Sequence, residues 1–257
     1  MALSDRLPDP GFKRHFTGAT THNNNGDFGP GFKSVKVVSD QKVMMSRTNS
    51  QRILSKAVAG QKWNIEIGYN PMTQDEFRPI QAFLQMKQGA LTPFFVALPQ
   101  YNTPANADWI ANLTNTDSGV NSGNPYVFTQ PAADAVPAGS TSISIYSANW
   151  VNNHAQTPTN IPLPGEMFTI ADGSNTNHKK TYMITTVETL NVQQAGSVPA
   201  HQIRLGISPP LAKEVSQNAV FTFITPLFKV IMPTAIRSYS LNTENLYSFS
   251  LKLEEYL

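Results

Sequence analysis

Apolar and polar residues alternate along several segments of the chain, which is the pattern of β-strands with one buried face. The alternation is strictest in residues 61–69, whose apolar positions are Trp63, Ile65, Ile67 and Tyr69. Residues 34–46 and 246–253 alternate in the same way, and residues 91–98 and 228–232 are short apolar runs. Short strands flanked by Gly, Pro or Asn are also expected at residues 140–146, 166–170, 180–187, 202–207 and 219–223. The pattern predicts a mainly β fold.

One helix is predicted after Thr73, which has Glu76 three residues later in the spacing of a capping box. The apolar positions of this segment form a helical stripe made of Phe77, Ile80, Phe83 and Leu84. Pro79 conflicts with an uninterrupted helix, because an interior proline removes a hydrogen bond and clashes with the preceding turn. We expect a short helical turn at 73–77 and then the main helix, which ends at Gly89 and packs on the apolar face of residues 61–69.

Charge is distributed unevenly along the 257 residues. Residues 1–100 hold twelve Lys and Arg against seven Asp and Glu, whereas no basic residue lies between Lys87 and Lys179. A change of this kind near residue 101 indicates a domain boundary. We expect an extended N-terminal arm (1–34), a β domain made of residues 35–101 and 226–257, and an inserted antiparallel β domain (102–225).

Composition narrows the class of protein. Only 14% of the residues are charged, and 19 Pro and 15 Gly favour short strands and turns over a helical bundle. The absence of cysteine excludes disulfides, cysteine-ligated zinc and thiol catalysis. A net charge of +2 is too small to indicate a nucleic-acid binder. The first residues lack the apolar core of a secretory signal, and no apolar run approaches the ~20 residues that span a bilayer.

Catalytic motifs are missing from the sequence. It contains no nucleophile elbow, paired-histidine zinc motif, Walker loop or dinucleotide fingerprint. Three groups of residues are candidate sites. His15, His22 and Asp27 could bind a metal, and Asp75 and Glu76 could form a glycosidase carboxylate pair. The third group could contact phosphates and consists of Lys13, Arg14, His15, Phe16, Phe32, Lys33 and Lys36. Each group is explained by loop polarity, helix capping or subunit contact. We therefore assign no catalytic, cofactor-binding or metal-binding residue.

Two blocks of sequence resemble tail structural proteins of tailed bacteriophages. Residues 63–73 read WNIEIGYNPMT and continue into Glu76, Phe77, Pro79 and Ile80, which resembles the Trp-bearing strand, turn and helix of those proteins. The second block resembles their inserted β module and closing strand; its matching segments are residues 136–143, 164–168, 182–185, 208–211 and 246–255. The ordered set points to the distal-tail or baseplate-hub family.

This resemblance implies a tail-tube-like β-sandwich or barrel with one packed helix, plus an inserted small antiparallel β domain. It implies a structural protein of the virion tail, made in the cytoplasm of the host bacterium, without enzymatic activity or cofactor. Its subunits would form a ring, typically a hexamer, that joins the tail tube to the baseplate or host-recognition apparatus. DNA would pass through the ring without specific binding.

Other functions remain open from the sequence. Within phage tails, the alternative is a tube or tube-initiator subunit. A different class is a carbohydrate-binding module, in which Tyr101, Trp109 and Trp150 of the insert would stack on sugars of the cell surface. A cell-wall hydrolase is the third alternative, although no catalytic constellation supports it.

Overall fold

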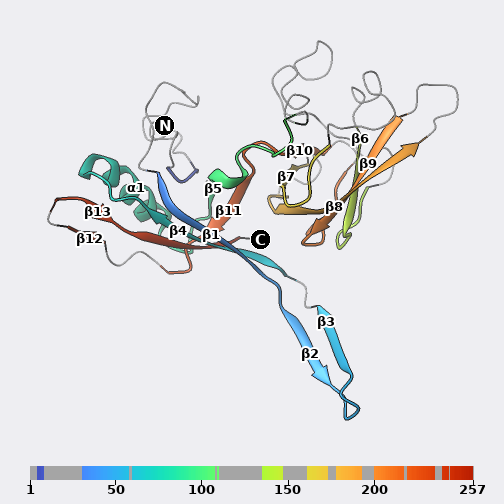
Figure 1. Cartoon of the computed structure of the whole chain (residues 1–257). Helices are drawn as coiled ribbons and strands as arrows, with labels where there is room; N and C mark the ends of the chain where they lie inside the picture. Colours follow the sequence, from blue (N-terminus) through green and yellow to red (C-terminus); the bar gives the residue numbers. More distant parts are fainter. Residues whose placement is uncertain are drawn as a thin grey trace. The chain divides into compact units, whose positions relative to one another are not determined.

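The structure, a computed structural model, describes residues 5–8, 31–57, 60–107, 109, 135–146, 161–172, 178–192, 200–216, 219–234, 239–242 and 244–256. The chain divides into two compact units (Figure 1). The first unit is Met1–Ala97 with Phe228–Leu257, and the second unit is Leu98–Leu227. Both consist mainly of antiparallel strands, which confirms the predicted mainly β fold with a helix.

A five-stranded sheet organises the first unit. Its order is β1 (Phe32–Asp40), β4 (Lys62–Tyr69), β14 (Ser250–Glu255), β11 (Leu227–Ile231) and β5 (Phe94–Ala97). The central part is in register, so that Ile65 lies opposite Val37 on one side and Leu253 on the other. The predicted apolar face of residues 61–69 is buried, whereas Glu66 on the opposite face is exposed. One face of this sheet therefore belongs to the core and the other to solvent.

Helix α1 (Gln74–Lys87) runs without interruption, so the predicted break before Pro79 is wrong. Glu76 accepts hydrogen bonds from the backbone N–H and the hydroxyl of Thr73, both at 2.9 Å, and the bond from the N–H is the Glu76 half of the predicted capping box. Pro79 costs the helix the bond to the carbonyl of Asp75, a residue in the exposed first turn where water can replace the missing donor. The helix ends at Gln88, which takes the left-handed conformation before Gly89.

The apolar stripe of α1 is buried as predicted. Its contact with the sheet runs through Phe83, whose ring lies edge-on to Phe94 of β5 at 5.3 Å between centroids. Phe77 stacks on Tyr247, 4.5 Å away, in the small hairpin of β12 (Ser240–Leu241) and β13 (Tyr247–Ser248). The predicted strand 246–253 is therefore two strands, interrupted at Phe249. Before Phe249, Tyr247 of β13 pairs with Met72, and after Phe249, β14 pairs with β4.

The predicted strand 34–46 is also two strands. β1 ends at Asp40, and β2 (Val43–Arg47) pairs with β3 (Ile53–Ala57) instead of with the sheet. The turn between them closes with a hydrogen bond from the N–H of Gln51 to the carbonyl of Thr48. This β2–β3 hairpin extends away from the sheet of the first unit (Figure 1).

Part of the predicted N-terminal arm belongs to the first unit itself. Leu7 is buried, and Asp5–Leu7 run beside β5, bonding to Phe95 in both directions. Lys87, with only 3% of its side chain exposed, reaches Asp5 at 2.8 Å. Of the remaining arm, residues 1–4 and 9–30 lie outside the described part, and β1 already begins at Phe32.

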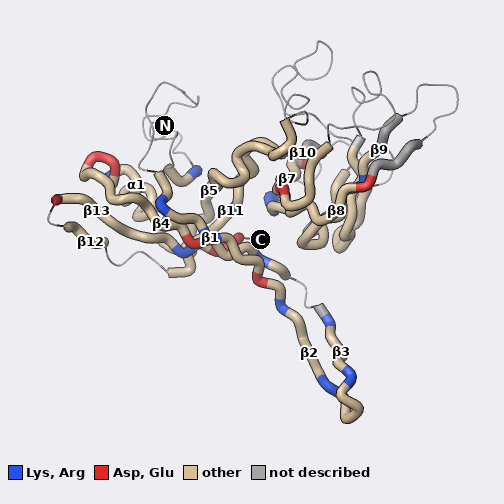
Figure 2. The backbone as a smooth tube through the Cα atoms, in the orientation of Figure 1, with Lys and Arg blue, Asp and Glu red and all other residues tan. Residues whose placement is uncertain are grey.

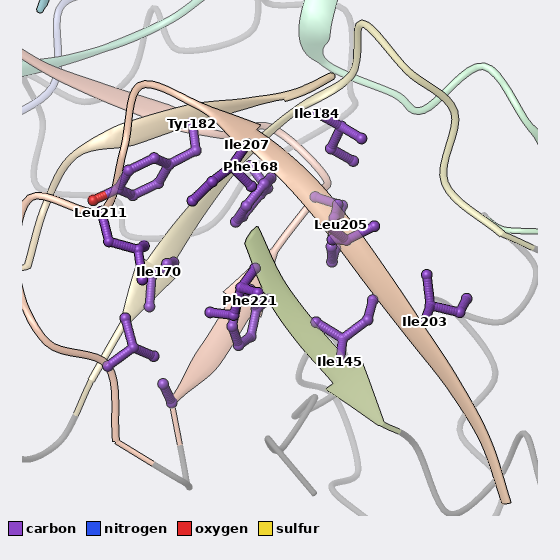
Figure 3. Close-up of a cluster of buried hydrophobic side chains, with 14 of the residues drawn as sticks. Ile145, Phe168, Ile170, Tyr182, Ile184, Ile203, Leu205, Ile207, Leu211 and Phe221 are labelled. Atoms are coloured by element: carbon purple, nitrogen blue, oxygen red, sulfur yellow. The ribbon is translucent and has the colours of Figure 1, made fainter. Parts of the chain in front are cut away.

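The second unit has its own five-stranded antiparallel sheet. The order is β10 (Val220–Thr222), β7 (Met167–Ala171), β8 (Thr181–Val192), β9 (Ala200–Ser208) and β6 (Ser142–Tyr146), which confirms the five strands predicted here. A short 3-10 helix, η2 (Pro99–Tyr101), leads into the unit. The buried side chains form one hydrophobic core (Figure 3), whose labelled members include Ile145, Phe168, Tyr182, Leu205 and Phe221.

The edge-on contact between Phe83 and Phe94 predicts a large effect of truncating Phe83. We expect Phe83→Ala to lower the free energy of unfolding of the first unit by about 3–5 kcal/mol, because it leaves a cavity between helix and sheet. Gln85→Ala, at an exposed position of the same helix, is the matched control and should leave the stability within about 0.5 kcal/mol. Urea denaturation of both variants makes the comparison, and equal midpoints would contradict this packing.

Candidate assembly surfaces

The two edges of the first unit's sheet differ. β5 is covered on its outer side by Asp5–Leu7. In the described part of the chain, β1 pairs with β4 alone and forms the other edge. An edge strand presents unpaired N–H and C=O groups that can bond to another chain. β1 is therefore the open edge of this unit.

The β2–β3 hairpin is exposed on both faces. Directly opposite residues place Val43, Met45 and Ile53 on one face, and Met44 and Leu54 on the other. Met44 and Met45 expose 67% and 65% of their surface. An isolated two-stranded hairpin is marginally stable in water, and contiguous exposed apolar side chains mark a contact site. The hairpin is therefore a surface that a partner would cover.

The hairpin is also basic. Lys42, Arg47, Arg52 and Lys56 lie on it, and no acidic residue lies between Asp40 and Glu66 (Figure 2). Among the described residues, none of these four side chains forms an ion pair. Sequence reasoning missed this surface, although the run of 25 residues without a carboxylate was visible in the sequence.

On the exposed face of the sheet, three lysines are paired with two glutamates. Glu66 lies between Lys36 and Lys252, with N–O distances of 3.8 and 3.5 Å. Lys62 bonds to Glu254 at 2.6 Å. Solvent-exposed pairs of this kind contribute only about 0–1 kcal/mol each. Their main effect is that the cations on this face are neutralised by neighbouring carboxylates.

The structure describes two of the three aromatic residues proposed as sugar platforms, Tyr101 and Trp109. Trp109 is fully buried and packs edge-on against Phe223 at 5.2 Å, so it belongs to the core of the second unit and cannot stack on a sugar. Tyr101 is half-buried, and burial raises the pKa of its hydroxyl. Trp150 lies outside the described residues.

The residues of the candidate metal, glycosidase and phosphate sites have local structural roles where the structure describes them. The carboxylate of Glu76 caps α1, and Asp75 lies 3.9 Å from Arg78. Phe32 packs against Tyr69, and Lys33 is exposed. The group Lys13, Arg14, His15, Phe16, His22 and Asp27 lies outside the described residues.

A buried polar cluster lies in the second unit. The hydroxyl of Tyr182 is 2.7 Å from Nε2 of His178 and accepts the N–H of Ala212. Burial lowers the pKa of His178 most strongly, and the charge of nearby Asp172 acts in the opposite direction. Asp172 is itself bonded to the N–H and hydroxyl of Ser216 at 2.7 and 2.6 Å. The cluster joins β7 and β8 to residues 212–216 and is structural.

Burial also raises the pKa of Glu166, against the effect of the Ala105 N–H, which donates to this carboxylate at 2.9 Å. The described residues contain no group of His, Asp and Glu that could hold a metal ion. No helix in the described part of the chain has the length and hydropathy needed to cross a membrane.

An open sheet edge, an exposed hairpin and a second compact unit define the molecule as an assembly protein. Residues 18–101 match the family model described as distal tail protein pb9, A domain, N-terminal. This match is to the phage distal tail protein family, and it covers the part of the chain from residue 18 to residue 101. No curated protein matches the chain. The matched segment holds β1, the hairpin, β4, α1 and β5, and it ends near the start of the second unit.

The match supports the coarser part of the functional prediction, a structural tail component. The protein is a structural, non-enzymatic component of the virion tail. It associates with other tail proteins.

The lowered pKa of His178 predicts a pH dependence of stability. Below the ordinary value of 6.5 the unfolded chain binds a proton that the folded chain does not, so stability falls as pH falls towards the lower folded pKa. One proton gives a slope of at most about 1.4 kcal/mol per pH unit.

Replacing His178 by Gln should flatten this slope below pH 6.5, even though the variant is less stable at every pH. Denaturant titrations of both proteins between pH 5 and 8 measure the two slopes. Glu188→Gln, at an exposed position, is the control and should keep the wild-type slope. Equal slopes for wild type and His178→Gln would contradict the assignment.

Proposed function

We propose that this protein is a ring subunit of the distal tail. In this proposal six copies join the tail tube to the baseplate or host-recognition apparatus around the passage for DNA. The observation that carries the proposal is the family match over residues 18–101, since this segment contains both the open edge β1 and the uncovered hairpin. Surfaces of both kinds are satisfied by lateral neighbours.

The pairing of cations with carboxylates on the exposed sheet face supports passage of DNA without specific binding. Lys36 and Lys252 share Glu66, and Lys62 is paired with Glu254. Phosphate binding needs cations that are free to replace counterions. A face on which carboxylates neutralise the cations lets DNA slide past.

The second unit is proposed to be an inserted domain carried by the ring subunit. It has its own hydrophobic core, and the two chain segments at its base are joined, because Thr225 donates to the carbonyl of Asn102 at 3.0 Å. In the first unit, β5 and β11, which lead into and out of this insert, are neighbours in one sheet. The size of the insert argues against a repeating tube subunit, which needs compact stacking faces. Contact of the insert with cell-surface glycans stays a prediction, and Trp109 cannot take part in it.

The ring predicts a discrete oligomer. We expect mass photometry at micromolar concentration to show a species of about six chains, and electron microscopy to show annular particles with a central opening. Incubation with the neighbouring tail proteins is the second arm, since some rings close only on their neighbours. A monomer in solution that also lacks lateral contacts in the intact virion would refute the ring.

The insertion predicts that the first unit folds without the second. Replacing residues 103–224 by a short Gly/Ser linker should leave a folded, cooperative unit, because the linker joins two positions that are already hydrogen-bonded to each other. The closure entropy of a loop changes by only about 0.6 kcal/mol per doubling of its length. Circular dichroism and a thermal melt test this, and adding Phe83→Ala to the deletion variant should abolish the melt. Solubility only with the insert present would show that the two units share a core.

A further inference from the structure

The two ends of the first unit's sheet carry different surfaces. β1 runs into the β2–β3 hairpin at Asp40, and β4 returns from it at Lys62. At the other end, Tyr69 leads through Met72, which pairs with Tyr247 of β13, to the start of α1. The hairpin and the α1 start therefore lie at opposite ends of the same two strands (Figure 1).

The end opposite the hairpin is apolar and acidic. Tyr239 and Leu241 each expose about half of their surface, and Tyr239 packs on Phe77 at 4.9 Å, which joins the β12–β13 hairpin to α1. The carboxylates of this end are Asp75, Glu76 and Glu244 (Figure 2). Among the described residues, the one cation at this end is Arg78. We call these residues the acidic end.

We propose that the β2–β3 hairpin of one copy docks on the acidic end of a second copy of this chain. The inference rests on the proposed ring and names the contact that would build it. The hairpin offers exposed apolar side chains and four unpaired cations, and the acidic end offers exposed apolar side chains and three carboxylates. Complementary charges of this kind fix the partner and the register of an interface.

The position of the two surfaces at opposite ends sets the kind of assembly. A contact between two different surfaces of identical chains is head-to-tail, and it closes into a ring when the rotation between copies allows. DNA is a poorer occupant of the hairpin, because phosphates would leave Val43, Met45 and Ile53 on one face and Met44 and Leu54 on the other uncovered.

A charge swap in the full-length protein tests the contact. The hairpin variant is Arg47→Glu with Arg52→Glu, and the end variant is Asp75→Lys with Glu244→Lys; Glu76 is left in place because it caps α1. Each variant alone places like charges together and should lose the oligomer in mass photometry. An equimolar mixture should regain it as an alternating ring, and so should a single chain that carries all four changes. The control is Lys179→Glu with Arg204→Glu in the second unit. It changes the net charge by the same amount as the hairpin variant and should assemble like wild type.

The absence of cysteine from the chain provides a second readout. Met44→Cys with Leu241→Cys should give covalent ladders on oxidation, whereas Met44→Cys alone and Leu241→Cys alone can give no disulfide-linked species larger than a dimer. Rings that persist in both charge variants, or a mixture that stays monomeric, would overturn the docking contact while leaving the ring in place. If wild type is monomeric in solution, the cysteine pair decides: ladders uphold the contact, and the absence of ladders overturns it. A mobility shift with duplex DNA that the hairpin variant loses, at unchanged oligomer mass, would assign the hairpin to DNA and overturn the proposal.

Discussion

The pairing of β4 with β1 on one side and β14 on the other is the contact on which the first unit depends. It joins three segments distant in the sequence and places Ile65 and Ile67 between Val37, Val35, Leu253 and Leu251. Since side chains alternate between the faces of a strand, a slip of one residue would expose this apolar row and bury Glu66. The register therefore decides both what α1 can cover and which charged residues face solvent.

The same pairing explains how the chain holds a second unit. β14 comes from the last residues, so the sheet is complete only when the chain returns after residue 227. The return strand β11 lies next to β5, the last strand before the insert. The ends of the insert thus leave from neighbouring strands, and its length has little influence on the sheet because closure entropy grows slowly. Growth at this site leaves the open edge β1 unchanged.

Local patterns predicted much of this fold. The strand at 61–69, the capping box of Thr73 and Glu76, and the five strands of the second unit follow from alternation, spacing and flanking turn residues. Predictions that depended on distant partners were less accurate. α1 continues through Pro79 because its apolar stripe is buried, and local helix propensity does not include that burial. The break at Phe249 depends on the hydrogen bonds between Met72 and Tyr247. The sequence pattern predicts one strand over residues 34–46 because the apolar positions of β2 continue those of β1. The sheet itself ends with β1, and β2 pairs with β3 instead.

Candidate contact surfaces are harder to predict than cores, because the sequence gives the type of an apolar residue but not whether its side chain is exposed or buried. Val43 and Met45 are two positions apart on one face of their strand, as Ile65 and Ile67 are, yet only Ile65 and Ile67 meet a neighbouring strand of their own sheet on both sides. What distinguishes the hairpin in the sequence is charge, because all of its charged residues are cations. Like charges close together repel and are retained only where something outside the fold offsets them. A one-signed charge run on an amphipathic hairpin is thus better evidence for a partner than its hydrophobicity.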